Sequence, residues 1–140
     1  MIKYLIIILL LSSAVVADDV LYNWNVIKVI DGDTIQFEAP WVPKPLKPVI
    51  SVRVFGVDTP EKAPKNKCQQ EDEMAQKATT FTKEAIANAK NIRVSLKDWD
   101  KYAGRVLGIV VIDGISLGEQ LLKNKLARPY FGGKKEGWCN

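Results

Sequence analysis

One long segment of this sequence has a helical period, and most of the rest has the pattern of short strands. This combination limits the fold to a small α+β domain. Residues 71–90 repeat small and apolar side chains at three- and four-residue steps. These positions are Met74, Ala78, Phe81, Ala85 and Ala89. Acidic residues gather at the start of the segment and Lys90 lies at its end, as the helix dipole prefers. We therefore expect one long helix here, with β structure before and after it.

Short β-like runs bounded by glycine, proline and aspartate make up most of the remaining sequence. They cover residues 26–30, 35–37, 49–57, 91–96 and 105–117, the last divided by the hairpin signal Asp113-Gly114. A shorter helix is expected over 116–126, with Ser116 as a candidate N-cap. Residues 39–48 contain four prolines, which is typical of a stiff loop and not of a central strand. Within that loop, Trp41 is either a packing residue or an exposed stacking surface.

This order of elements predicts the class and the architecture of the fold. Five short strands with one long and one short helix suit an α+β protein built on a small five-stranded β-barrel of the OB type. An open sheet with helices on one side is the alternative.

The N-terminus has the pattern of a secretory signal peptide. A lysine precedes an apolar run, and Val15 and Ala17 occupy the two positions that a cleavage site before Asp18 requires. The run is too short for a membrane span, and an uncapped N-terminal core helix is the alternative. We expect 1–17 to be a signal peptide and 18–140 to be one domain, exported as a secreted or periplasmic protein without stable membrane association.

The absence of histidine restricts the chemistry. It excludes a histidine general base, an imidazole metal ligand and a histidine nucleophile. Any acid–base step must therefore use carboxylates, lysine, tyrosine or metal-bound water. The 20 Lys and Arg residues against 16 Asp and Glu residues permit a polyanionic partner without requiring one.

Two cysteines, Cys68 and Cys139, lie far apart in the sequence. In an exported protein a disulfide between them is the default expectation, and two free thiols or an intermolecular bond are the alternatives. The disulfide would close a loop of about 70 residues and contribute about 3–4 kcal/mol in the chain-entropy model.

Two acidic turns interrupt the β-like runs and form the candidate site. Asp31 and Asp33 flank a glycine in VIKVIDGDTIQF, and Asp58 ends a run shortly before Glu61. Each motif alone is typical of an ordinary turn. If neighbouring strands bring Asp33 and Asp58 together, the paired carboxylates need a cation or a shared proton. With oxygen ligands alone, that cation would be calcium or magnesium.

Arginines supply the opposite charge. Arg53 precedes Asp58 by five residues, so it would face the other side of an ideal strand unless a bulge or Gly56 bends the chain. Arg105 follows a glycine-containing turn. A guanidinium group suits phosphate because its planar fork donates two hydrogen bonds. The net charge of the site can be counted from Asp33, Asp58 and Glu61, one divalent cation and these two arginines. The sum is a single positive charge, which a phosphodiester monoanion neutralises.

Three motifs occur in order around the helical segment 80–90: DGDT (31–34), RVFGVDTPE (53–61) and DKYAGR (100–105). Together they resemble the thermonuclease, or staphylococcal nuclease-like, family. Each motif is short, and their combination and order carry the specificity.

The resemblance implies an OB-fold, calcium-dependent phosphodiesterase. Such an enzyme would act as a monomer on DNA and RNA and leave 3′-phosphate and 5′-hydroxyl products. By match to the family, Asp33 and Asp58 would hold Ca²⁺ together with the backbone carbonyl of Thr59. Glu61 would orient or deprotonate the attacking water.

The remaining roles are implied in the same way. Arg53 and Arg105 would clamp the phosphate and stabilise the charge that grows in the transition state. Lys101 and Tyr102 would contact a terminal phosphate of the substrate. Asp31 would lie next to the metal ligands without binding the ion itself.

Three expectations complete the sequence analysis. Tyr130 is either a base-stacking residue or a core residue. The C-terminal helix of the best-known family member has no counterpart here, so we expect a Cys68–Cys139 disulfide to anchor the tail in its stead. A non-catalytic OB-type binding module is the competing function. Such modules typically lose acidic or arginine positions that this chain keeps.

Overall fold

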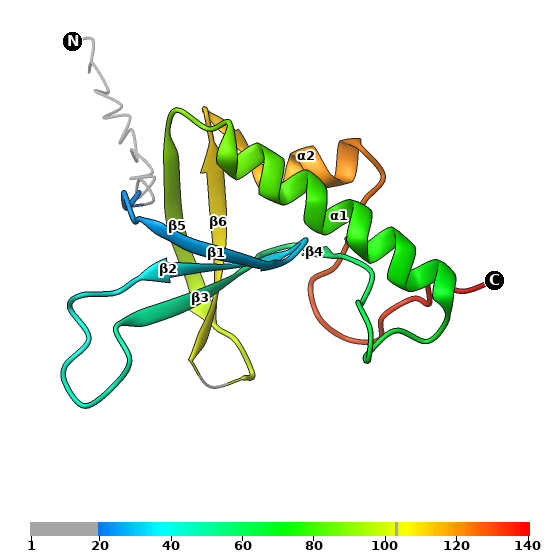
Figure 1. The fold of residues 1–140 in the computed structure, drawn as a ribbon, viewed down its shortest axis with the longest axis horizontal. Coiled ribbons are helices and arrows are strands. Elements are labelled where there is room, and N and C mark those ends of the chain that lie inside the picture. The colour runs from blue at the N-terminus through cyan, green and yellow to red at the C-terminus, as the bar shows by residue number, and fades with distance from the viewer. Residues whose placement is uncertain (1–19, 103) are drawn as a thin grey trace, which may run out of the picture.

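The computed structural model describes residues 20–102 and 104–140, and the expected signal peptide, 1–17, lies outside these residues. The described strands of the main sheet are β1 (Val26–Asp31), β2 (Thr34–Glu38), β3 (Val49–Val54), β5 (Ile92–Trp99), β6 (Arg105–Ile112) and β7 (Ile115–Ser116). They form one mixed sheet in the order β1-β2-β3-β6-β5, with β7 paired to β6 (Figure 1). Only the β3–β6 pair is parallel among these described pairs.

The strand prediction differs from the structure in two places. The run predicted over 49–57 is broken at Phe55-Gly56, because Gly56 has a φ of 83° and turns the chain. After this turn, β4 (Val57–Asp58) leaves the main sheet and pairs with β8 (Arg128–Pro129). Strand β8 was not predicted, because its proline and the glycines after it are untypical of a strand.

The α+β class and the two helices are confirmed. They are α1 (Gln69–Ala87) and α2 (Leu117–Lys123). Ser116 caps α2, where its hydroxyl accepts a hydrogen bond from the backbone N–H of Glu119 at 3.2 Å. Figure 1 shows both helices on one side of the sheet and the long β2–β3 loop projecting away from them. No helix within residues 20–102 and 104–140 is long and apolar enough to cross a membrane.

The main sheet has six strands, not the five expected, and its two ends come together at one point. Tyr22, which precedes β1, exchanges two backbone hydrogen bonds with Val94 of β5, at 2.8 and 2.9 Å. The core is formed by apolar side chains of the sheet and α2. Its fully buried members include Ile35, Phe37, Val52, Val54, Val94, Val110, Leu117 and Leu121.

The first acidic turn, between β1 and β2, packs directly against α1. Thr82 of α1 donates its hydroxyl hydrogen to the backbone carbonyl of Gly32 at 2.8 Å. A Cβ at Gly32 would lie 2.8 Å from the Cβ of Ala78, so only glycine fits this close approach. The helix thereby fixes the position of the turn that carries Asp31 and Asp33.

The disulfide prediction is confirmed. Cys68, the residue that caps the start of α1, is bonded to Cys139 in the C-terminal tail. The tail is therefore tied to the same end of α1 that follows the second acidic turn.

The Thr82–Gly32 contact generates a stability prediction. Thr82→Val keeps the side-chain shape but leaves a buried carbonyl without this donor, which should lower the free energy of unfolding by about 1–3 kcal/mol. Thr80→Val, on the exposed face of the same helix, should change it by less than about 0.5 kcal/mol. Urea unfolding measures both. An equal loss in the two variants would attribute the effect to helix propensity and contradict the prediction.

Candidate functional site

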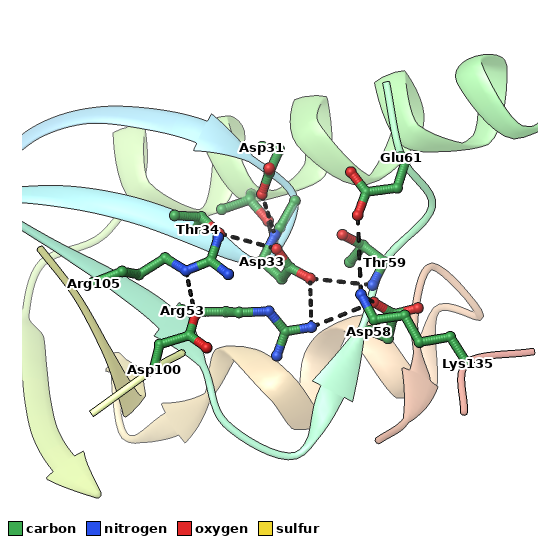
Figure 2. A network of polar contacts seen from close by, with 12 residues as sticks. Asp31, Asp33, Thr34, Arg53, Asp58, Thr59, Glu61, Asp100, Arg105 and Lys135 are labelled. Atoms are coloured by element: carbon green, nitrogen blue, oxygen red, sulfur yellow. Dashed lines mark hydrogen bonds and ion pairs between the residues drawn. The ribbon is translucent and has the colours of Figure 1, made fainter. Parts of the chain in front are cut away.

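A buried guanidinium group joins the two predicted acidic turns. Arg53 Nη2 lies 3.6 Å from Asp33 Oδ2 and 3.3 Å from Asp58 Oδ1 (Figure 2). Each of these three residues is at most 9% exposed. The prediction that the two turns approach each other is therefore confirmed, with Arg53 between them.

The turn at Gly56 explains how Arg53 reaches Asp58. In a continuous strand, residues five apart would point to opposite faces. The positive φ of Gly56 reverses that relation, because β4 starts in a new direction at Val57. The turn between β1 and β2 is joined to β3 by a hydrogen bond from the Val54 N–H to the Asp33 carbonyl, at 2.8 Å.

Asp33 has the most perturbed environment of the acidic residues. Its Oδ2 accepts from the Thr59 N–H at 3.2 Å, and its Oδ1 accepts from the Thr34 hydroxyl at 3.1 Å. Burial, followed by the charge and hydrogen bonding of Asp31, raises the pKa of Asp33 to about 6. The opposing effects of Arg53 and the Thr59 N–H are too small to cancel this rise.

Glu61 lies at the rim of the site, with 43% of its side chain exposed. Its position depends on Glu71, a residue of α1 that is only 4% exposed. Glu71 accepts hydrogen bonds from the N–H of Glu61 at 3.3 Å and from the N–H of Lys67 at 2.7 Å. The start of α1 thus holds the loop that carries Glu61.

Arg105 lies in the same cleft but has its own acidic partner. Its Nε donates to Asp100 Oδ2, and its guanidinium carbon lies 4.7 Å from the centre of the Tyr102 ring. The Lys101 ammonium lies 5.3 Å from that ring. All four residues line a cleft of about 530 Å³, which also contains Asp31, Asp33, Arg53, Glu61 and Tyr130.

Tyr130 is half-buried at the wall of the cleft and is not part of the described core. Its ring centre lies 5.7 Å from the guanidinium carbon of Arg53. Its hydroxyl donates to the carbonyl of Gly133 at 2.9 Å. Tyr130 therefore lines the cleft and is not among the residues of the described core.

A lysine from the C-terminal tail, which sequence reasoning missed, completes the site. Lys135 Nζ lies 2.9 Å from Asp58 Oδ1 and 4.0 Å from Glu61 Oε1. Figure 2 shows it on the opposite side of Arg53 from Arg105 and Asp100. Partial burial acts to lower the pKa of Lys135, but the hydrogen bond and charge of Asp58 outweigh it and raise that pKa above the ordinary value.

Asp100 and Glu71 were also missed as site residues. Asp100 stands at the start of the motif DKYAGR, so its spacing from Arg105 was a usable signal. Glu71 was read only as a favourable charge at a helix start. Nothing in the sequence pattern distinguishes Lys135 from the other lysines of the tail.

The donor set suits a hard divalent cation. Asp33 and Asp58 are buried carboxylates that share one guanidinium group. Burial, followed by the charge of Asp31, raises the pKa of Asp33. A cation here would be held by these two residues and the Thr59 backbone. Elsewhere in the described chain, Cys68, Glu71 and Cys139 bring three potential ligand atoms together, but the disulfide leaves no thiolate.

Comparisons with known proteins give one consistent result. Residues 51–137 match the family described as Staphylococcal nuclease homologue. The chain is 35% identical over 110 residues to Thermonuclease from Staphylococcus hyicus, across 78% of this chain and 60% of that relative. It is 31% identical over 116 residues to Endonuclease YhcR from Bacillus subtilis (strain 168), across 79% of this chain and 9% of that relative. The chain thus spans less than two thirds of either relative.

The raised pKa of Asp33 predicts how stability depends on pH in the absence of metal. The folded protein keeps the Asp33 proton up to about pH 6, whereas the unfolded chain releases it near 3.8. This stabilising contribution is fully present below the unfolded value and is lost as the pH rises to about 6, by about 3 kcal/mol in total.

Urea unfolding with a chelator, between about pH 4 and pH 7, tests this sign. The stability of Asp33→Asn relative to wild type should increase with pH over this range. Glu84→Gln, at an exposed position of α1, should follow the wild-type curve. Parallel curves for wild type and Asp33→Asn would contradict the assigned pKa.

Proposed function

Since the chain belongs to the staphylococcal nuclease homologue family, we propose that it is a nuclease that hydrolyses phosphodiester bonds in DNA and RNA. Membership confirms the resemblance drawn from the three sequence motifs. The observation that carries the proposal is the cluster in which Arg53 joins the buried Asp33 and Asp58, beside Glu61 and Arg105 in one cleft. We further propose calcium dependence and products with a 3′-phosphate and a 5′-hydroxyl.

In this proposal, Asp33, Asp58 and the Thr59 carbonyl hold Ca²⁺. The ion, when bound, supplies Lewis-acid polarisation of the phosphate and of a nearby water. Glu61 accepts the proton of the attacking water, which suits a chain without histidine. Its exposed position at the rim leaves room for water, and the buried Glu71 keeps its backbone in place.

The two arginines act on the phosphate. The guanidinium of Arg53 is anchored by two carboxylates, so it is already oriented before substrate arrives. Asp100 holds Nε of Arg105, which leaves the terminal nitrogens of that side chain as the donors for a phosphoryl oxygen. Preorganised donors of this kind stabilise the charge that develops in the pentacoordinate transition state.

The rest of the cleft suits the substrate chain. Lys101 and Tyr102 lie beside Arg105, where they would contact a neighbouring phosphate. The half-buried ring of Tyr130 would stack on a base. The bridge from Tyr22 to Val94 supports the interpretation of the sheet as a closed OB-type barrel.

Export, as a monomer, is part of the same proposal. The disulfide between Cys68 and Cys139 is typical of an oxidising compartment, and the N-terminal sequence has the pattern of a signal peptide. Such a compartment also supplies more calcium than the cytosol does.

The first test is cleavage of duplex DNA and of RNA by the purified protein in calcium. We expect both to be cut, with activity abolished by a chelator and restored by added calcium. End-labelling of the products identifies the 3′-phosphate. Binding to nucleic acid without chelator-sensitive cleavage would favour the binding-module alternative and overturn the proposal.

The second test concerns Arg53. Arg53→Lys keeps the charge but loses the planar fork, so kcat/KM should fall by about 100- to 1,000-fold. Arg93→Lys, at an exposed position of β5, is the matched control and should leave kcat/KM unchanged. Circular dichroism of both variants checks folding. Full activity in folded Arg53→Lys would remove Arg53 from the proposed chemistry.

A further inference from the structure

The Lys135 ammonium contacts a carboxylate that the proposed metal site would use. It lies 2.9 Å from Asp58 Oδ1, the same oxygen that lies 3.3 Å from Arg53 Nη2. It also lies 4.0 Å from Glu61 Oε1. From these contacts we infer that Lys135 is a built-in cation of the acidic site, which competes with the divalent metal for Asp58. The inference rests on the metal site of the proposed function.

The charges of the cleft explain why a further cation is held there. Arg53 and Lys135 contact three carboxylates, those of Asp33, Asp58 and Glu61. These bring three negative charges, and Arg53 balances one of them. Arg105 does not balance a second, because its nearest carboxylate partner is Asp100. Lys135 reduces the remaining excess from two charges to one. The tail therefore supplies part of the positive charge that these carboxylates require.

Contacts within the C-terminal tail hold the segment that carries Lys135. The guanidinium carbon of Arg128 lies 3.8 Å from the centre of the Trp138 ring, and Trp138 is only 8% exposed. Arg128 Nη1 also donates to the carbonyl of Gly137 at 2.6 Å. With the Cys139 disulfide, these contacts fix the segment just after Lys135. The position of its ammonium is thus a property of the folded tail.

Competition follows from the shared oxygen. A metal ion held by Asp58 would share that carboxylate with the ammonium group, so the two positive charges would repel each other. The coupling is reciprocal, so the lysine weakens metal binding as much as the metal weakens the lysine contact. Since the lysine stem is flexible and 40% exposed, the ammonium group can leave when the ion arrives. The result is a metal site that fills only at the high calcium concentrations found outside cells.

Calcium titration by calorimetry, without nucleic acid, tests the competition. Lys135→Met should bind calcium at least about fivefold more tightly than wild type, the lower end of typical coupling between two ligands. Two controls remove one positive charge each without touching Asp58. Lys134→Met is the exposed neighbour in the tail, and Lys65→Met lies in the same cleft. Both should stay within about twofold of wild type, because exposed charges are largely screened.

Thermal unfolding gives a second readout that needs no activity. In a chelator, Lys135→Met should unfold at a lower temperature than Lys134→Met, because Asp58 and Glu61 lose their contact with the Lys135 ammonium. Added calcium should stabilise Lys135→Met more than it stabilises wild type. A folded Lys135→Met in chelator, verified by circular dichroism, shows that the comparison concerns the site and not the fold.

The outcomes separate this inference from the proposed function. Equal calcium affinity in wild type and Lys135→Met would overturn the inference while leaving the nuclease proposal intact. An equal increase in calcium affinity in Lys65→Met and Lys135→Met would also overturn it, because the increase would then follow from the loss of any positive charge in the cleft. Absence of calcium binding in all four proteins would overturn the inference together with the calcium dependence of the nuclease.

Discussion

The contact of Arg53 with Asp33 and Asp58 is the interaction on which the site depends. It joins the β1–β2 turn, β3 and β4 at a position almost closed to water. Removing the guanidinium group would leave two carboxylates facing each other in a buried site, which is strongly unfavourable. Keeping it does not cancel the effects of burial and of the neighbouring Asp31, which together raise the pKa of Asp33. The fold therefore holds Asp33 and Asp58 in a buried cluster that is stable only with positive charge beside it.

Much of this arrangement could be predicted from the sequence, because it depends on local patterns. Asp33 lies in the turn between two strand runs and Asp58 ends another, so both acids are at element ends, where neighbouring strands bring them together. The relation of Arg53 to Asp58 could not be predicted in the same way, since alternation along a strand places them on opposite faces. Gly56 was visible as a possible bend, but its positive φ and the direction of β4 are set by the pairing of β4 with the distant β8.

Two other features depend on tertiary contacts that leave no periodic pattern in the sequence. The apolar period of α1 runs through Phe81 and Ala85, yet its buried face also includes Thr82, which lies outside that period. That face must be small and partly polar, because it meets the backbone of Gly32. Hydrophobic periodicity indicates which helix face packs against other side chains, and it does not indicate a face that packs against backbone. Lys135 is placed by the disulfide and by the folded tail, so its sequence neighbourhood contains no trace of its role.

The two cations that contact Asp58 differ in kind, and the difference matches their places in the fold. Arg53 lies on a central strand and bridges two buried acids, a position that favours a planar, always charged and weakly hydrated group. Lys135 lies on a half-exposed tail and makes one short contact with a compact ammonium on a flexible stem. A lysine at position 53 would satisfy fewer acceptors in a buried site, and an arginine at position 135 would be harder to displace. The site thus combines one cation held by two buried acids and one on a flexible, partly exposed stem, as the proposed competition between Lys135 and a metal ion requires.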